Sequence, residues 1–352
     1  MSTNSIKASS TFFDRFNNQD IVKFSLTNQN NVTVSAISLG ATLYEFSIPT
    51  NTGRTNLVLN YPNSGDYLAN PFYVSMGIGR TGGRIKDGQL PLNGQTYQLQ
   101  TNEGTTTLHG GPNGFNTQVW DGEIVEEDGE PTIQFHHTQL GSEDGFPGDL
   151  DVTIIYRLTN DNTLKLTFEA TALNQDTVFN PTYHTYFNLG DNDTILKHNL
   201  QINAEQHLEF DDKKLPTGNF LAVENTPFDF RQTTSLGNAI QDMQSTSEKG
   251  FDDIFKINDD AISNTIATLQ DPETNRSVSI NSDRNGLVVF TANSFTKEDM
   301  NFSRTNGIGI PYEGVALEAQ NLPDATRFNN FGNIIIKAGE TKVHEIDYHV
   351  EF

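Results

Sequence analysis

A strict alternation of apolar and polar residues is the feature that most constrains the fold of this chain. Apolar side chains take every second position from Val152 to Leu158 and again from Leu164 to Phe168, with Asn160-Asp161-Asn162 between the two runs. Successive side chains of a strand point to opposite faces, so each run places its apolar residues on one face. Because Asn and Asp favour tight turns, the segment predicts a β-hairpin with one buried face.

The same period of two recurs near both ends of the chain, from Val22 to Leu26 and from Ile346 to Phe352. Helical spacing is convincing only between Leu236 and Met243, behind Ser235 as the cap. Many strands and almost no helix predict an all-β sandwich or barrel. The composition shows no linker and no repeat of fixed period, so we expect one domain over residues 1–352 and no propeller.

The charge balance excludes several classes of partner. Lys and Arg number 22 against 45 Asp and Glu, which gives a formal net charge of −23. The phosphates of nucleic acids and of anionic membranes would be repelled, so neither is an expected partner. The chain has no cysteine, which excludes disulfides and thiolate chemistry. Its first residues lack an apolar signal region and it has no long apolar run, so we expect a soluble, cytoplasmic protein.

The segment Asn180–Gly190, NPTYHTYFNLG, places one imidazole among large aromatic residues. His184 has Tyr183, Tyr186 and Phe187 beside it, and such flat, partly polar rings can stack on a sugar or an aromatic ligand. An imidazole with an ordinary pKa of ~6.5 both donates and accepts protons near neutral pH. A buried histidine hydrogen-bonded to a backbone carbonyl is the plainer interpretation, and for a single histidine it is the commoner case.

Four further segments combine glycine with a charged or polar group: GRTGGRI with Arg80 and Arg84, LHGGPNGF with His109, GFDDIF with Asp252 and Asp253, and GVALEAQNLPD with Glu318. A histidine before Gly-Gly and paired aspartates in a loop are usually turn residues. Glu318 differs, because it interrupts an apolar strand-like run. A buried carboxylate is costly unless it is paired, and burial raises its pKa toward the working range of a general base. A functional and a structural role are equally open for Glu318 at this point.

Signatures of metal sites and of cofactors are missing from the sequence. His136 and His137 are adjacent strand residues, so their side chains face opposite sides, and no H-x-H pair or cysteine supports a zinc site. GRTGGRI is neither a dinucleotide fingerprint nor a P-loop, and no G-x-S-x-G nucleophile occurs. We therefore expect no metal and no cofactor. The residues indicate an acid–base site with hydrogen-bonding groups for a polyhydroxylated ligand.

Several of these motifs, taken in their order along the chain, resemble the signature stretches of aldose 1-epimerases (galactose mutarotases). The resemblance rests on SMGIGRTGGRI, LHGGPNGF, SEDGFPGDLDVTIIYRLT, NPTYHTYFNLG, LPTG, GFDDIF and GVALEAQNLPD, and it runs from about Leu39 to the C-terminus. It implies a large antiparallel β-sandwich that interconverts the α and β anomers of a free hexose such as galactose or glucose, without a cofactor.

The resemblance also implies roles for five residues. Glu318 matches the general base that removes the proton from the anomeric hydroxyl, and His184 matches the acid that protonates the ring oxygen. Arg84, His109 and Asp252 match residues that hydrogen-bond the sugar hydroxyls. The expected partner is thus a small-molecule sugar, and the expected oligomeric state is a monomer or a homodimer.

Four positions depart from the family pattern: Gly83, Tyr183, Asp253 and Arg284. Relatives often carry Asn, Asn, His and Gln near these positions, and we expect three of the four to set substrate choice. Gly83 lacks a side chain, so we also expect it to open space for glucose-type sugars and for a second ring.

Three alternatives to a hexose mutarotase are open. One is an epimerase for a disaccharide such as maltose, and another is an epimerase for a sugar phosphate held by Arg80, Arg84 and Arg284. The third is a silent carbohydrate-binding protein. Simple sugar binding needs neither an acid nor a base, so the presence of both His184 and Glu318 argues against this third alternative.

Overall fold

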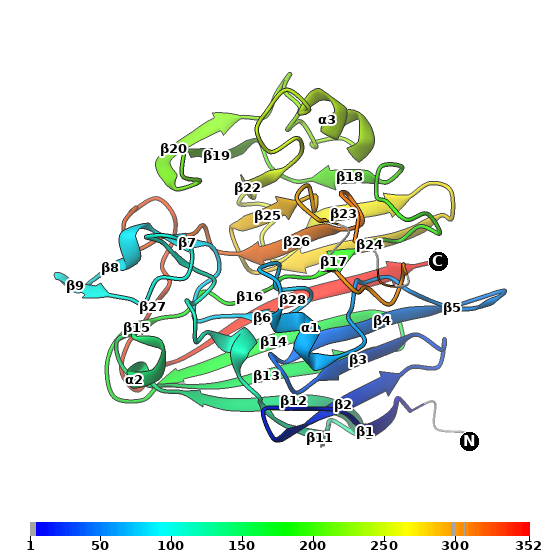
Figure 1. The fold of residues 1–352 in the computed structure, drawn as a ribbon, viewed down its shortest axis with the longest axis horizontal. Coiled ribbons are helices and arrows are strands. Elements are labelled where there is room, and N and C mark those ends of the chain that lie inside the picture. The colour runs from blue at the N-terminus through cyan, green and yellow to red at the C-terminus, as the bar shows by residue number, and fades with distance from the viewer. Residues whose placement is uncertain (1–4, 297–299, 306, 308) are drawn as a thin grey trace.

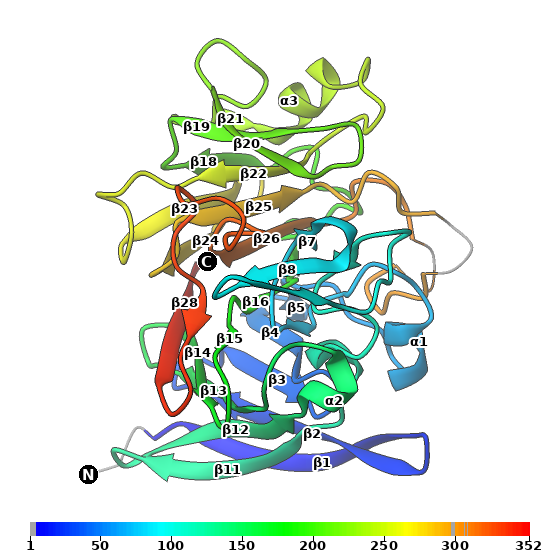
Figure 2. The same ribbon diagram turned by 90° about the vertical axis from the view of Figure 1, so that its left-hand side faces the viewer.

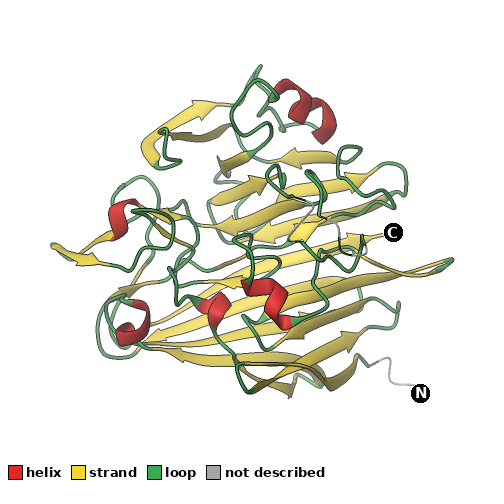
Figure 3. Cartoon of the chain, in the orientation of Figure 1, coloured by secondary structure: helices red, strands yellow, loops and turns green. Residues whose placement is uncertain are grey.

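The protein is described here from a computed structural model that covers residues 5–296, 300–305, 307 and 309–352. Strands dominate these residues and the helices are short turns between them (Figure 3). The predicted hairpin is present: β13 (Leu150–Leu158) pairs antiparallel with β14 (Thr163–Ala172), and buried residues alternate along both. The predicted helix is α3 (Leu236–Asp242), whose Asn238 amide donates to the Ser235 hydroxyl at 3.3 Å.

Three antiparallel sheets account for most of the described strands (Figure 1). In spatial order, the nine-stranded sheet of the described residues contains β11 (Asp121–Glu127), β12 (Glu130–Gln139), β13, β14, β28 (Thr341–Glu351), β24 (Arg276–Ser282), β23 (Thr265–Asp271), β18 (Asn199–Ile202) and β21 (Thr234–Ser235). A five-stranded sheet contains β1 (Lys7–Phe16), β2 (Gln19–Thr27), β3 (Thr33–Ile37), β4 (Thr42–Thr50) and β5 (Gly53–Asn56). A six-stranded sheet contains β17 (Tyr186–Phe187), β26 (Val315–Gln320), β25 (Gly286–Phe290), β22 (Asp252–Lys256), β19 (Gln206–Phe210) and β20 (Pro216–Ala222).

The nine-stranded sheet forms one layer of a sandwich and the other two sheets form the second layer. Phe24 of the five-stranded sheet packs edge-to-face on Phe135 of the nine-stranded sheet, with 5.5 Å between ring centroids. Phe187 of the six-stranded sheet packs on Tyr348 at 5.2 Å. A β-bridge between Val58 and Phe187 joins the two smaller sheets. One apolar cluster fills the space between the layers, so the predicted all-β sandwich is confirmed.

Short paired segments cover one end of the sandwich (Figure 2). They are β6 (Gly77–Ile78) with β16 (Thr182–Tyr183), β7 (Arg84–Ile85) with β10 (Thr107–Leu108), β8 (Gln89–Leu92) with β9 (Gln95–Gln98), and β15 (Thr177–Val178) with β27 (Ile335–Ile336). In the described part of the chain, the remaining helices are α1 (Ser64–Leu68), α2 (Gly141–Asp144) and two 3₁₀ turns, Lys86–Gly88 and Phe115–Thr117. Among the described residues, no helix has the length and apolar character needed to cross a membrane.

Candidate active site

The outer face of the six-stranded sheet forms the floor of a cleft of ≈ 300 Å³. Along β26, Val315, Leu317 and Ala319 join the apolar cluster between the layers, and a strand alternates its side chains. Glu318 therefore points to the opposite face, into the cleft, where it lies 1% exposed. Its cross-strand neighbour Val288 lines the same floor.

The same alternation separates the two aspartates of β22. Asp252 pairs with Phe290 of β25, and both line the cleft. Asp253 takes the other face of the strand and is 7% exposed. Only the first of the two carboxylates is therefore placed to meet a ligand in the cleft.

His184 stands between β16 and β17, and the pairing of β17 with β26 sets it beside Glu318. The His184 amide donates to the Met76 carbonyl at 3.1 Å, and the Ser75 amide donates to the His184 carbonyl at 2.9 Å. These bonds hold the backbone, so the imidazole Nε2 lies 3.3 Å from Glu318 Oε1. The other polar atom of each side chain, His184 Nδ1 and Glu318 Oε2, is buried without a hydrogen-bond partner among the described residues.

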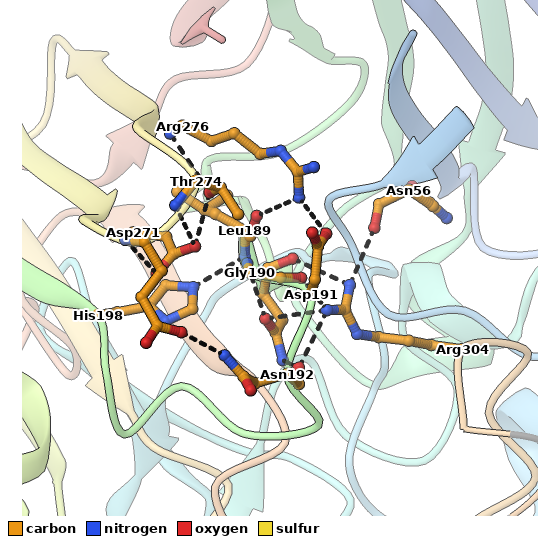
Figure 4. A network of polar contacts seen from close by, with 12 residues as sticks. Asn56, Leu189, Gly190, Asp191, Asn192, His198, Asp271, Thr274, Arg276 and Arg304 are labelled. Atoms are coloured by element: carbon orange, nitrogen blue, oxygen red, sulfur yellow. Dashed lines mark hydrogen bonds and ion pairs between the residues drawn. The ribbon is translucent and has the colours of Figure 1, made fainter. Parts of the chain in front are cut away.

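A polar network fixes the chain just after His184 (Figure 4). Arg304 donates to the carbonyls of Asn188 and Gly190, and Arg276 donates to the Leu189 carbonyl at 2.9 Å. The Leu189 amide donates to His198 Nε2 at 2.9 Å. These contacts satisfy the backbone of a segment that leaves the sheet, and they hold the position of β17, which directly follows the loop that carries His184.

His109 follows β10, and its neutral tautomer can be read from one hydrogen bond. The Gly83 amide donates to His109 Nδ1 at 3.1 Å, so Nδ1 is an acceptor and the ring proton resides on Nε2. Burial, with smaller contributions from His184 and Arg84, lowers the His109 pKa well below 6.5, which keeps the ring neutral. His109 thus offers the cleft an N–H donor.

Arg84 of β7 lies opposite Leu108 of β10 and reaches into the same cleft. Its Nε and Nη2 donate to the two carboxylate oxygens of Glu103 at 2.7 and 2.9 Å. Nη2 also lies 4.0 Å from Asp252 Oδ2. Aromatic rings form much of the wall: Phe72, Tyr73, Tyr186, Phe210 and Phe290. Rings beside hydrogen-bonding groups suit a ligand with both apolar faces and polar edges, as a pyranose has.

Burial shifts the pKa values of the facing pair in opposite directions. It lowers the His184 pKa from 6.5 to about 3, and it raises the Glu318 pKa well above 4.5, with the nearby Asp252 charge adding to the increase. These opposite shifts favour a neutral carboxyl group facing a neutral imidazole, so that the pair holds one proton.

Comparison with known proteins places the chain in a family. The sequence model described as aldose 1-epimerase matches residues 22–349. The chain belongs to the aldose 1-epimerase family. An aldose 1-epimerase of Streptococcus thermophilus is 38% identical over 99% of this chain and 98% of its own length. A maltose epimerase of Levilactobacillus brevis is 37% identical over 94% of this chain and 95% of its own length. A solved galactose 1-epimerase from Lactobacillus acidophilus has a TM-score of 0.84 at 29% identity and covers 99% of both chains.

Membership in the aldose 1-epimerase family makes this protein an isomerase, as the motifs predicted, and its sandwich has the fold of solved relatives. The structure brings all five predicted site residues, Glu318, His184, Arg84, His109 and Asp252, to one cleft. Sequence reasoning missed Glu103, Asn102 and Tyr73, which line the same cleft. The segment TNEGTTTLHGG places Asn102 and Glu103 only a few residues before His109, and this closeness was the available signal.

Three of the four departures from the aldose 1-epimerase pattern lie away from the cleft, so the expectation that three would set substrate choice is wrong. The Tyr183 hydroxyl donates to the Ala41 carbonyl at 2.8 Å in the apolar interior. Asp253 is buried on the other face of β22. Arg284 is fully buried and donates to Asn180 and to the Pro181 carbonyl. Of the four, only Gly83 lines the cleft.

The expectation that Gly83 opens space is also wrong. Its φ of +76° is a conformation that favours glycine, and a Cβ there would lie 2.5 Å from Pro323 Cβ. The position beside Gly83 is thus already filled by Pro323. What Gly83 supplies to the aldose 1-epimerase site is the amide that orients His109.

The arginines invoked for a sugar phosphate do not converge. Arg80 is fully buried and ion-paired with Asp144 at 2.6 Å, and Arg284 is buried beside Asn180. Among the described residues that line the cleft, Arg84 is the sole Lys or Arg. The cationic cluster that a phosphate would require is therefore missing from this cleft.

His109, His184 and Glu318 also form a group whose ligand atoms lie within 4.8 Å of one another. Two histidines and a carboxylate are a familiar metal-binding set. A metal-bound histidine normally donates its second ring N–H to an acceptor, but His109 Nδ1 faces the Gly83 N–H donor. Coordination through His109 Nε2 would break this bond and set two donors against each other, so the residues fit a metal poorly.

Proposed function

We propose that this aldose 1-epimerase family member interconverts the α and β anomers of a neutral free sugar, with Glu318 and His184 as the acid–base pair. The observation that carries the proposal is their geometry: two buried titratable groups at the cleft floor, 3.3 Å apart, each with one polar atom that lacks a partner among the described residues. Buried polar groups are normally satisfied, so these atoms are suited to hydrogen-bond a ligand.

The chemistry needs one proton removed and one proton delivered. A sugar hydroxyl that donates to Glu318 favours the charged carboxylate, and the shared proton then resides on His184. Glu318 takes the proton of the anomeric hydroxyl while His184 protonates the ring oxygen, and the C1–O5 bond breaks to give the open aldehyde. Rotation about C1–C2 and readdition with the roles reversed yields the other anomer. The pair holds the same number of protons before and after the reaction.

The remaining cleft residues hold the ring in place. His109 donates through Nε2, Asp252 accepts, and Arg84 donates through the N–H groups that Glu103 does not occupy. Residues from three separate segments thus hydrogen-bond different edges of one sugar, and this orients the anomeric carbon toward the acid–base pair.

A disaccharide with a free reducing end is a second candidate substrate. The relative named maltose epimerase is 37% identical over 94% of this chain, a similarity close to that of the relative named aldose 1-epimerase. We therefore place galactose, glucose and maltose in one substrate panel.

Polarimetry on freshly dissolved single anomers of these three sugars tests the proposal. We expect the protein to accelerate the change in optical rotation of at least one sugar far above the spontaneous rate. A protein that binds sugar but accelerates none of them would be a carbohydrate-binding protein and would overturn the proposal.

A further inference from the structure

Glu103 stands at the mouth of the cleft as the direct partner of Arg84. Its side chain is 41% exposed, and both of its carboxylate oxygens accept hydrogen bonds from the Arg84 guanidinium. A planar guanidinium held through two N–H groups has its orientation fixed, because the fork matches a carboxylate. The Arg84 Nη1 group has no hydrogen-bond partner among the described residues and is available to a ligand.

The turn that carries Glu103 is itself tied to the site. The Glu103 and Thr106 amides donate to each other's carbonyls at 3.1 and 2.9 Å. The side chain of the preceding residue, Asn102, accepts from the Leu108 amide at 2.8 Å and donates to the Leu108 carbonyl at 3.0 Å. Asn102 also donates to the Tyr73 hydroxyl at 3.2 Å. Leu108 directly precedes His109. This one turn therefore fixes the position of Glu103 and also that of the loop that carries the His109 N–H donor.

Carboxyl groups outnumber cations in the cleft. Of the described lining residues, Arg84 carries the positive charge, and Glu103, Asp252 and Glu318 carry carboxyl groups. Even with Glu318 protonated, two carboxylates surround one guanidinium. An anionic sugar would meet this excess of negative charge, and the one guanidinium that could offset its carboxylate is already paired with Glu103.

We propose that Glu103 is a positioning and specificity-determining residue: it orients the Arg84 guanidinium toward sugar hydroxyls, and its charge makes the cleft reject anionic sugars such as uronic acids. The inference rests on the proposed function, since it concerns selection among substrates of that same site.

Two variants separate the two roles. Glu103→Gln keeps the size and removes the charge, whereas Glu103→Asp keeps the charge and shortens the reach to Arg84. Both should raise KM for glucose with a smaller change in kcat, because Arg84 loses its orientation. Only Glu103→Gln should lower the preference for glucose over glucuronate, by at least ~10-fold, about 1.4 kcal/mol.

Glu127→Gln is the matched control. Glu127 pairs with Arg157, both side chains are about one-third exposed, and neither lines the cleft. The substitution changes the net charge of the protein by the same amount as Glu103→Gln. It should leave the ratio of kcat/KM for glucose to kcat/KM for glucuronate unchanged. This control separates a local effect of Glu103 from the electrostatic potential of the whole acidic protein.

The decisive measurement is kcat/KM for glucose and for glucuronate by polarimetry, with dissociation constants by calorimetry for the same pairs. The inference is overturned if the glucose-to-glucuronate ratio of kcat/KM in Glu103→Gln stays within about two-fold of the wild-type ratio. It is also overturned if Glu127→Gln changes this ratio as much as Glu103→Gln does. If wild type catalyses neither reaction, the calorimetric ratio still tests the charge selection while the proposed function fails. Absence of binding to any neutral sugar overturns both.

Discussion

Arg80 and Arg84 lie four residues apart in one glycine-rich segment, yet the structure gives them opposite tasks. Arg80 is fully buried, and its guanidinium donates to Asp144, to Thr177 and to three backbone carbonyls. Arg84 is partly exposed in the cleft, with two of its nitrogens bound to Glu103. A guanidinium whose donors are all occupied can only hold structure, whereas one with donors to spare can bind a ligand.

The same contrast holds for the buried acids. The Glu313 carboxylate accepts from Thr305 at 2.7 Å and from the Ile310 amide at 3.1 Å, so both of its oxygens have partners. Glu318 is as deeply buried, and its Oε2 has no hydrogen-bond partner among the described residues. Burial alone therefore does not identify a functional acid, but burial with an unpartnered oxygen facing a cleft does. The predictions below test this distinction.

The largest effect is expected at the acid–base pair. Glu318→Gln and His184→Asn should each lower kcat/KM by ~10²–10⁴-fold, because each removes a group that transfers a proton. Polarimetry measures the loss, and Glu313→Gln is the control, as a substitution of a buried glutamate outside the cleft. A Glu318→Gln variant that keeps more than about a tenth of the activity would contradict its role as the base.

The next effect distinguishes the two arginines. Arg80→Met should lower the free energy of unfolding by about 3–5 kcal/mol, since it leaves Asp144 buried without its cation. Arg84→Met should cost less than about 1 kcal/mol of stability, because its ion pair is partly exposed, but it should raise KM. Urea denaturation and steady-state kinetics on both variants make the comparison. Equal decreases in the free energy of unfolding for Arg80→Met and Arg84→Met would contradict the proposed difference between the two arginines.

A smaller effect on stability is expected at Asp253. Burial raises its pKa from 3.8 to about 6, so the folded state binds the proton more tightly than the unfolded state. Such a group favours folding below pH 3.8 and loses that contribution as the pH rises to 6. Asp253→Asn should therefore raise the free energy of unfolding by about 2–3 kcal/mol at pH 7.5, with the gain shrinking toward pH 4. Asp212→Asn, which removes one carboxylate at an exposed position, is the control for the change in net charge.

The pH profile of kcat/KM should report the shared proton. Activity requires one proton on the pair, so the alkaline limb marks its loss from Glu318 and the acid limb marks a second proton on His184, near pH 3. The Asp252 charge raises the Glu318 pKa, and Asp252→Asn should shift the alkaline limb to lower pH. A shift to higher pH, or none, would show that Asp252 does not act on Glu318 electrostatically.

The smallest effect is expected from metal removal. Dialysis against EDTA should leave the rate unchanged, because the Gly83 amide keeps His109 in the tautomer that cannot ligate through Nε2. A loss of activity that a divalent ion restores would show that the three clustered side chains bind a metal after all.

Much of the fold and the centre of the site followed from local pattern. Period-2 alternation predicted β13, β14 and β28 because one face of each strand must be buried. The sequence pattern favoured a turn at Asp252 and Asp253, whereas both lie in β22, where they face opposite sides. Glu318 was recognisable because a carboxylate inside an apolar strand is costly unless it is used, and the ordered motifs assigned His184 as its partner.

The tertiary structure decided which face of each strand meets a ligand and which charges are satisfied. Local pattern in GRTGGRI does not distinguish Arg80 from Arg84, because their partners Asp144 and Glu103 lie 64 and 19 residues away in sequence. Only the family resemblance pointed to Arg84. The sequence likewise does not show where Arg284 and Tyr183 find their partners. Their hydrogen bonds lie in the interior and not in the cleft. Strand alternation is a local property of the backbone, whereas burial and partner satisfaction depend on contacts that only the packed sheets create.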